Sequence, residues 1–160
     1  MRRSMLFLPG NTPNMLINGN CLGSDAVIFD LEDAVSPAEK DAARILVRNT
    51  MRYMDFRGCE IIVRINSIDT PYWKKDIDEI LPYKPGLILL PKTGTAQDAL
   101  EADAYITQVE QKLGMAPNTV GLMPLIETAM GVENAFSIAS SCKRIHALFL
   151  GAEDLTADLR

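Results

Sequence analysis

The chain has 160 residues, 48% of them hydrophobic and 23% charged, a composition typical of a globular protein with one hydrophobic core. Its net charge of −5 argues against nucleic acid as a partner, because a protein that neutralises phosphates usually carries a basic excess. No apolar run approaches the ~20 residues of a membrane-spanning helix, and the N-terminal run stops at Pro9 and Gly10, too early for a signal peptide.

Six short apolar runs follow one another along the chain, and most are bounded by Gly, Pro or Asp. They are SMLFLPG at 4–10, AVIFDLED at 26–33, EIIVRINS at 60–67, GLILLPKT at 86–93, VGLMPLIET at 120–128 and ALFLGAEDL at 147–155. Runs that are apolar on both faces predict strands of a parallel sheet covered on both sides.

Helical patterns lie between these runs, and the clearest cover 36–54, 95–114 and 129–142. The first has Ser36 in the N-cap position, Pro37 at the first helical position and Glu39 as the partner in a capping box. The second ends on Gly114, a natural C-cap. Strand and helix signals therefore alternate, as they do in repeated β/α units.

Two α/β folds have this alternation, an open doubly wound sheet and a closed (β/α)₈ barrel. No G-x-G-x-x-G sequence follows the first run, which disfavours a dinucleotide-binding sheet. A barrel needs eight strands and about 250 residues. We therefore expect residues 1–160 to form a single barrel domain that covers six β/α units and stops before the last two.

Polar side chains gather at the carboxyl end of each run. They are Asp30, Glu32, Asp33, Arg64, Asn66, Lys92, Glu127, Glu153 and Asp154. In a parallel barrel these ends meet on one face, so we expect one pocket there. Glu127 and Asp154 can supply carboxylate oxygens to Mg²⁺, and Arg64 can hold a carboxylate or enolate oxygen of a small oxoacid. A helix cap or a solvated loop charge is the alternative for either carboxylate, and an ion pair with a nearby acid is the alternative for Lys92.

The cysteines Cys21, Cys59 and Cys142 are widely separated and odd in number. They match neither a disulfide framework nor a zinc site. We therefore expect the protein to work in a reducing compartment, the cytoplasm.

The motifs RSMLFLPGN, FDLEDAV, VRIN, LLPKT, PLIETAMGVENA and LGAEDL occur in this order. With them the chain resembles, from Arg3 to Arg160, the β-subunits of citrate lyase, which are citryl-carrier-protein lyases of the wider malyl-CoA lyase and HpcH/HpaI aldolase superfamily. The resemblance implies a (β/α)₈ TIM barrel of the phosphoenolpyruvate/pyruvate superfamily. It also implies a trimer or hexamer of identical chains and a Mg²⁺ site.

The same resemblance assigns roles to individual residues. Glu127 and Asp154 are expected to bind the metal, and Arg64 and Glu127 are expected to contact the substrate. Asp30 and Glu32 are expected to hold metal-bound water and the arginine in place. In relatives, a C-terminal segment supplies an aspartate to the site of a neighbouring subunit. No residue of this sequence matches that aspartate, so the catalytic acid/base is left unassigned.

The reaction implied is the cleavage of a (3S)-citryl thioester, carried on an acyl carrier protein, into an acetyl thioester and oxaloacetate. The other subunits of a citrate lyase complex are the implied partners. A stand-alone lyase for malyl-CoA or citramalyl-CoA is the nearest alternative, and an aldolase for free hydroxy-oxoacids is another. An inactive binding or assembly module is a further alternative, because six strands without a closing pair leave open sheet edges.

Overall fold

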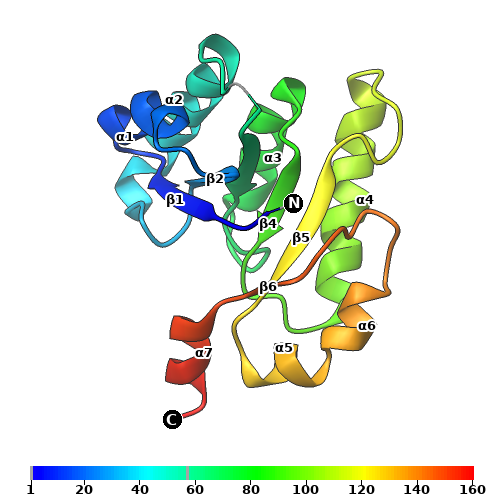
Figure 1. Cartoon of the computed structure of the whole chain (residues 1–160). Helices are drawn as coiled ribbons and strands as arrows, with labels where there is room; N and C mark the ends of the chain where they lie inside the picture. Colours follow the sequence, from blue (N-terminus) through cyan, green and yellow to red (C-terminus); the bar gives the residue numbers. More distant parts are fainter. Residues whose placement is uncertain (1, 57) are drawn as a thin grey trace.

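The computed structural model describes residues 2–56 and 58–160. Within these residues it has six strands: β1 (Met5–Pro9), β2 (Ala26–Asp30), β3 (Glu60–Arg64), β4 (Leu87–Leu90), β5 (Gly121–Ile126) and β6 (Phe149–Leu150). The strands follow chain order in one sheet, and all neighbouring strands are parallel (Figure 1). A doubly wound sheet reverses its strand order at a switch point, so this order excludes that fold.

Seven α-helices lie in the same described residues: α1 (Pro13–Asn18), α2 (Lys40–Tyr53), α3 (Trp73–Ile80), α4 (Ala96–Lys112), α5 (Ala129–Glu133), α6 (Ala135–Ala139) and α7 (Ala152–Asp158). Three 3₁₀ turns accompany them, at Gly19–Cys21, Pro37–Glu39 and Leu81–Tyr83. From α1 to α4, each helix packs against the next (Figure 1). Gly114 lies just beyond the end of α4 with φ of +66°, which confirms the expected helix end.

The sheet is curled, as a contact between its two outermost strands shows. Phe7 of β1 and Phe149 of β6 meet edge to face, with ring centroids 6.0 Å apart. Neighbouring strands lie about 4.8 Å apart, so in a flat sheet of this order the two outer strands would be separated by about 24 Å. The expected repeat of parallel β/α units is therefore confirmed. The units form a curled six-stranded half-barrel.

Each face of the sheet has its own hydrophobic core. The larger core packs between the sheet and the helices and includes Val27, Phe29, Val63, Ile88, Ile77 and Ile106. The smaller core fills the inside of the curl with Ala26, Ile28, Ile62, Leu87, Leu89, Met123 and Leu125. Successive residues of a strand point to opposite faces, which explains why neighbours such as Val27 and Ile28 belong to different cores.

The prediction of a capping box between Ser36 and Glu39 is wrong. A 3₁₀ turn precedes α2, and the Ser36 hydroxyl donates to the Glu39 carboxylate at 3.0 Å, whereas a cap would accept from a main-chain N–H. The carboxylate competes successfully for the hydroxyl because the turn brings the two side chains together. A capping box does occur at the start of α4, between Thr95 and Asp98.

Two other elements differ from the expected ones. The run at 147–155 is a strand only over β6, and Asp154 lies in the first turn of α7. The segment at 129–142 contains two short helices that meet at Asn134, whose side-chain amide donates to the main-chain oxygen of Gly94 at 2.9 Å. Among the helices of the described residues, none qualifies as a candidate membrane span.

Candidate active site at the carboxyl ends of the strands

Asp30 and Arg64 are the last residues of β2 and β3, and Glu127 directly follows β5. Each lies two residues beyond a residue of the inner core, namely Ile28, Ile62 and Leu125. The period of two along a strand therefore directs all three side chains to the inside of the curl, at its carboxyl end. Asp30 and Arg64 are also direct partners in the register of β2 and β3. Strand pairing alone thus places a carboxylate beside a guanidinium.

Arg64 is held from two directions. Its Nε and Nη2 donate to the two carboxylate oxygens of Asp30 at 2.8 and 2.6 Å, a bidentate contact. Its guanidinium carbon lies 5.2 Å from the ring centroid of Phe7, a cation–π contact. Although burial alone would lower the pKa of Arg64, the hydrogen bonds and charge of Asp30 raise it above its ordinary value. Arg64 is therefore a fixed, permanently charged cation.

Asp30 also shapes the loop that carries the next acidic groups. Its carboxylate accepts from the main-chain N–H of Glu32 at 2.8 Å and of Ala34 at 3.3 Å. This turn brings Oε2 of Glu32 to 3.1 Å, and Oδ2 of Asp33 to 3.3 Å, from Nη1 of Arg64. Burial raises the pKa of Glu32, and the charges of Arg64 and, more weakly, Lys92 act against that rise.

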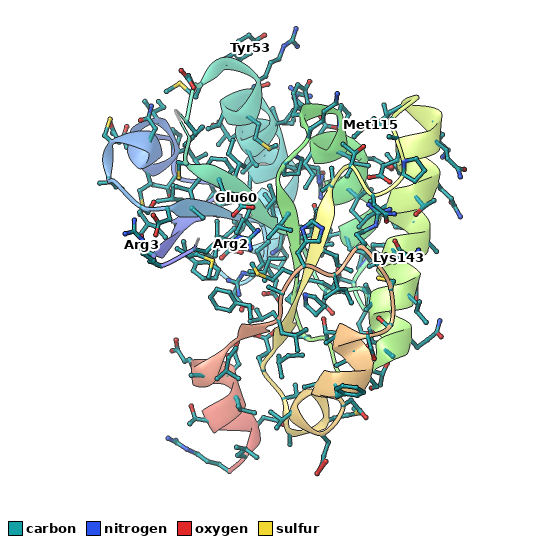
Figure 2. All side chains as sticks on the ribbon, turned by 45° about the vertical axis from the view of Figure 1, so that its right-hand side comes forward. Arg2, Arg3, Tyr53, Glu60, Met115 and Lys143 are labelled. Carbon is teal, nitrogen blue, oxygen red and sulfur yellow. The ribbon has the colours of Figure 1, made fainter. Side chains whose placement is uncertain are left out.

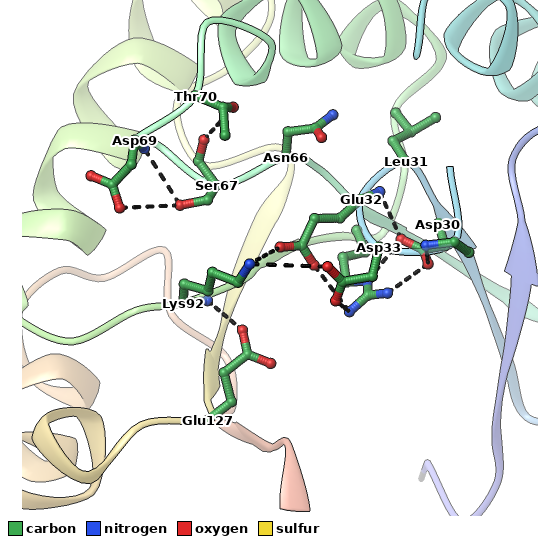
Figure 3. Close-up of polar contacts among 12 residues, drawn as sticks. Asp30, Leu31, Glu32, Asp33, Asn66, Ser67, Asp69, Thr70, Lys92 and Glu127 are labelled. Carbon is green, nitrogen blue, oxygen red and sulfur yellow. Dashed lines mark hydrogen bonds and ion pairs between the residues drawn. The ribbon is translucent and has the colours of Figure 1, made fainter. Parts of the chain in front are cut away.

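Lys92 lies two residues beyond β4 and contacts both Glu127 and the acidic groups around Arg64 (Figure 3). Its main-chain N–H donates to Oε1 of Glu127 at 2.6 Å, and its ammonium lies 3.3 Å from Oε1 of Glu32. The charge of Glu32, as the largest cause, raises the pKa of Lys92. The alternative of an ion pair between Lys92 and a nearby acid is therefore confirmed.

Glu127 and Asp154 come together at the mouth of the curl. Glu127 is buried, whereas Asp154 is exposed in the first turn of α7. Burial raises the pKa of Glu127 to about 7; the N–H of Lys92 opposes this shift, and the carboxylates of Glu32 and Asp154 add to it. Two carboxylates at such a position repel each other, and a bound cation would relieve that repulsion.

Two hollows share this carboxylate pair. One of about 290 Å³ is lined by Phe7, Arg64 and Phe149 as well as by Glu127 and Asp154. The other, of about 640 Å³, is lined by the same pair together with Asp69, Lys92, Thr95, Asp98, Thr128, Met130 and Asp158. Each hollow thus has one cationic side chain on its wall, Arg64 in the first and Lys92 in the second.

The donor set fits Mg²⁺, which proteins usually bind through one or two carboxylates, with water and substrate oxygens completing the octahedron. Glu127 and Asp154 provide two carboxylates, and the pKa of Glu127, raised first by burial, indicates a site where an additional positive charge is favourable. Across residues 2–56 and 58–160, no group of three or more His, Cys, Asp or Glu side chains forms a metal cage. The fit is therefore to an open site and not to a closed structural one.

A hollow of about 670 Å³ also lies at the opposite, amino-terminal end of the strands. Its charged residues neutralise one another or their neighbours: Arg2 pairs with Glu60 (Figure 2), and Asp25 pairs with Arg3 at 2.8 Å. Active sites of parallel barrels lie at the carboxyl ends of the strands. The carboxyl-end site is therefore the stronger candidate.

The structure brings together all five residues proposed for the site from the sequence, namely Asp30, Glu32, Arg64, Glu127 and Asp154. Sequence reasoning missed the contact of Phe7 with Arg64 and the place of Asp69, Asp98 and Asp158 on the wall of the larger hollow. The spacing of four residues between Asp154 and Asp158 is a signal for one helix face, but Asp154 was expected to lie in the strand run at 147–155.

The chain matches the family model described as HpcH/HpaI aldolase/citrate lyase over residues 3–160. Citrate lyase subunit beta of Leuconostoc mesenteroides subsp. cremoris is 42% identical over 160 residues, which are 100% of this chain and 53% of that protein. An L-malyl-CoA/beta-methylmalyl-CoA lyase of Cereibacter sphaeroides is 33% identical over 98% of this chain and 50% of its own length. The chain thus spans about half the length of the curated relatives it matches.

A solved structure of the citrate lyase beta subunit of Mycobacterium tuberculosis, complexed with oxaloacetate and magnesium, has a similar fold. Its TM-score is 0.73 at 32% sequence identity, over 97% of this chain and 60% of that one. A structure of the M. tuberculosis protein with magnesium and pyruvate has a TM-score of 0.75 at 31% identity, over 97% of this chain and 56% of that chain.

Proposed function

The chain belongs to the HpcH/HpaI aldolase/citrate lyase family, and on this premise we propose that it is a Mg²⁺-dependent carbon–carbon lyase, the β-subunit of a citrate lyase. Its substrate is a (3S)-citryl thioester, and its products are an acetyl thioester and oxaloacetate. The observation that carries this proposal is the pair of carboxylates, Glu127 and Asp154, that shares one hollow with the fixed cation Arg64. A metal-binding pair beside a cation suits an oxoacid that carries its own negative charge.

In this proposal Glu127 and Asp154 hold the metal, which supplies Lewis-acid polarisation of the substrate oxygens when bound. The substrate hydroxyl gives its proton to the acid/base group, which is unassigned in this chain, and its oxygen becomes the ketone oxygen of oxaloacetate as the neighbouring carbon–carbon bond breaks. The electron pair of that bond passes to the acetyl thioester, whose enolate oxygen Arg64 stabilises. A proton then returns to the enolate carbon. Asp30 and Glu32 keep the guanidinium in place during these steps.

The group that returns the proton stays unassigned in this chain. We propose that it is an aspartate on a C-terminal segment of a neighbouring subunit, in a trimer or hexamer. The six-stranded half-barrel would then belong to a (β/α)₈ barrel that two further units close. Open edges at β1 and β6 support this part of the proposal, because a sheet edge exposes unpaired N–H and C=O groups, and barrel closure removes such edges.

The proposed partners are an acyl carrier protein, which presents the thioester, and the other subunits of citrate lyase. The proposed location is the cytoplasm. The free thiols of Cys21, Cys59 and Cys142 support a reducing compartment.

The test is an assay of the full-length protein with citryl-carrier protein, citryl-CoA and malyl-CoA. We expect turnover of a citryl thioester that requires Mg²⁺ and is lost in Glu127→Ala. Equal or better turnover of malyl-CoA would favour the second candidate, a malyl-CoA lyase, which the relative at 33% identity supports. A protein that binds carrier protein or other subunits without any turnover would favour the inactive assembly module.

A further inference from the structure

Lys92 contacts Glu127 on one side and the acidic groups around Arg64, Glu32 and Asp33, on the other (Figure 3). Its N–H holds Oε1 of Glu127, and its ammonium faces Oε1 of Glu32. The main chain at Lys92 has φ of +52°, in the left-handed region that residues other than glycine rarely adopt. Non-glycine residues in this region cluster at functional sites, where the surrounding contacts maintain the strain. An ion pair with a nearby acid was an expected alternative for Lys92, whereas the contact of its N–H with Glu127 was not expected from the sequence.

The charges around Arg64 explain why a second cation matters. Its guanidinium faces the carboxylates of Asp30, Glu32 and Asp33, at distances of 2.6, 3.1 and 3.3 Å. One positive charge surrounded by three negative charges has little attraction left for an incoming anion. A substrate-binding arginine in this setting needs a further positive charge nearby.

Glu32 is the carboxylate through which Lys92 can act. It is buried, and neither of its carboxylate oxygens has a hydrogen-bond partner among the described residues. Its two oxygens instead face one cation each, Arg64 at Oε2 and Lys92 at Oε1. Lys92 is half exposed on the wall of the larger hollow, so the ion pair of Lys92 and Glu32 can respond to a ligand that enters there.

We propose that the ammonium of Lys92 is a positioning residue for substrate binding: by holding Glu32 from the side away from Arg64, it leaves Arg64 available for an anionic oxygen of the substrate. This inference rests on the proposed function, because it needs an oxoacid at Arg64. It predicts different effects on the binding of an anion and of a divalent cation. Without the ammonium the site is more negative, so an anion binds less tightly while a divalent cation binds equally or more tightly.

The experiment measures two dissociation constants by calorimetry on the full-length protein, one for Mg²⁺ alone and one for oxalate in saturating Mg²⁺. Oxalate serves as a stable stand-in for the paired oxygens of a 2-oxoacid. In Lys92→Met we expect oxalate to bind about tenfold more weakly and Mg²⁺ to bind at least as tightly as in the wild type. The main-chain N–H to Glu127 is retained in this variant. Lys92→Arg keeps the charge and should restore most of the oxalate affinity.

Lys84 provides a matched control. It also has φ of +52°, but it lies before β4, at the opposite end of the sheet. Lys84→Met removes a positive charge at a residue with the same φ angle, and it should leave the dissociation constants of Mg²⁺ and oxalate unchanged. In a Glu32→Gln background, Lys92→Met should weaken oxalate binding less than it does in the wild-type background, because Glu32, the nearer of the two carboxylates that Lys92 faces, has lost its charge.

The outcomes separate this inference from the proposed function. Wild-type affinity for oxalate in Lys92→Met overturns the inference alone, as does a weakening of Mg²⁺ binding in parallel with oxalate, which a merely structural role would produce. Wild-type protein that binds no oxalate in the presence of Mg²⁺ overturns the proposed function and the inference with it. The midpoint of thermal unfolding is recorded for each variant. If Lys92→Met does not fold, Lys92→Gln is measured against the same criteria.

Discussion

Gly151 lies directly against Glu127: a Cβ atom at Gly151 would stand 2.8 Å from Cβ of Glu127 and 3.0 Å from its Oε2. The N–H of Gly151 also donates to the main-chain oxygen of Ile126 at 2.9 Å. Glu127 is thus confined between Gly151 and the N–H of Lys92, which holds Oε1. The main chain on both sides therefore restricts the position of the Glu127 carboxylate.

The substitution Gly151→Ala should displace Glu127, because the new Cβ has no space. We expect Mg²⁺ to bind about 10- to 100-fold more weakly, and the free energy of unfolding to fall by about 1–3 kcal/mol. Calorimetry and urea titration measure the two quantities. Gly94→Ala is the control, because the nearest atom to a Cβ there is 3.5 Å away, an ordinary contact. Unchanged Mg²⁺ affinity in Gly151→Ala would contradict the assignment of Glu127.

Removal of the metal should lower the thermal stability of the protein. A ligand present at 100 times its dissociation constant stabilises the folded state by about 2.7 kcal/mol. We expect chelation to lower the unfolding temperature of the wild type, Mg²⁺ to restore it, and neither to affect Asp154→Asn. The neighbouring Glu153→Gln should behave like the wild type. A full response to Mg²⁺ in Asp154→Asn would show that the ion lies elsewhere.

Much of the fold could be predicted from the apolar runs, since buried parallel strands leave a strong pattern in the sequence. The end of the chain could not be predicted in the same way, because β6 pairs with β5 over only two residues, Phe149 and Leu150. An apolar pattern does not reveal where an edge strand stops and a helix begins. Asp154 was therefore placed correctly in the pocket but on the wrong element.

The candidate site could be predicted as a set of residues but not as a network. Strand ends converge by topology, so Asp30, Arg64 and Glu127 could be grouped without coordinates. The link through Lys92 depends on a positive φ at a lysine, which no propensity indicates. The contact of Phe7 with Arg64 depends on the curl of the sheet, a property of the whole fold.

Arg64→Lys should keep the charge and lose the bidentate contact with Asp30. We expect a folded protein whose kcat falls about 10²- to 10³-fold for the thioester, because a lysine cannot both pair with Asp30 and hold an enolate oxygen. Steady-state kinetics give kcat and KM, and circular dichroism checks the fold. Arg48→Lys, which changes a partly exposed arginine on α2, is the control. Wild-type kcat in Arg64→Lys would rule out this role.

Arg144 and Glu110 form a buried pair far from the site, with side chains that are 0% and 1% exposed. Nη1 and Nη2 of Arg144 donate to the two carboxylate oxygens of Glu110, both at 2.9 Å, and Nε donates to Asp103 at 2.6 Å. Burial alone would raise the pKa of Glu110, but the hydrogen bonds from Arg144 and from the N–H of Val120 lower it below its ordinary value. The pair joins α4 to the segment that leads into β6.

Stability should therefore depend on pH through Glu110. The folded-state pKa lies below the unfolded-state value of about 4.3, so the stabilising contribution is complete well above pH 4.3 and is lost as the pH falls through the folded-state pKa. Glu110→Gln should lower the free energy of unfolding at pH 7 by about 3 kcal/mol. The difference from the wild type should shrink below about pH 4, where Glu110 itself becomes protonated.

Urea titrations from pH 3 to pH 7 on both proteins measure this difference. Asp41→Asn is the control, because Asp41 is an exposed carboxylate whose pKa is lowered by its hydrogen bond with Arg44. Solvent screens that pair, so its removal should change the stability little at any pH. A difference between Glu110→Gln and the wild type that stays constant over the whole range would mean that the charge of Glu110 contributes nothing. The hydrogen bonds, which glutamine keeps in part, would then be the whole contribution of this residue.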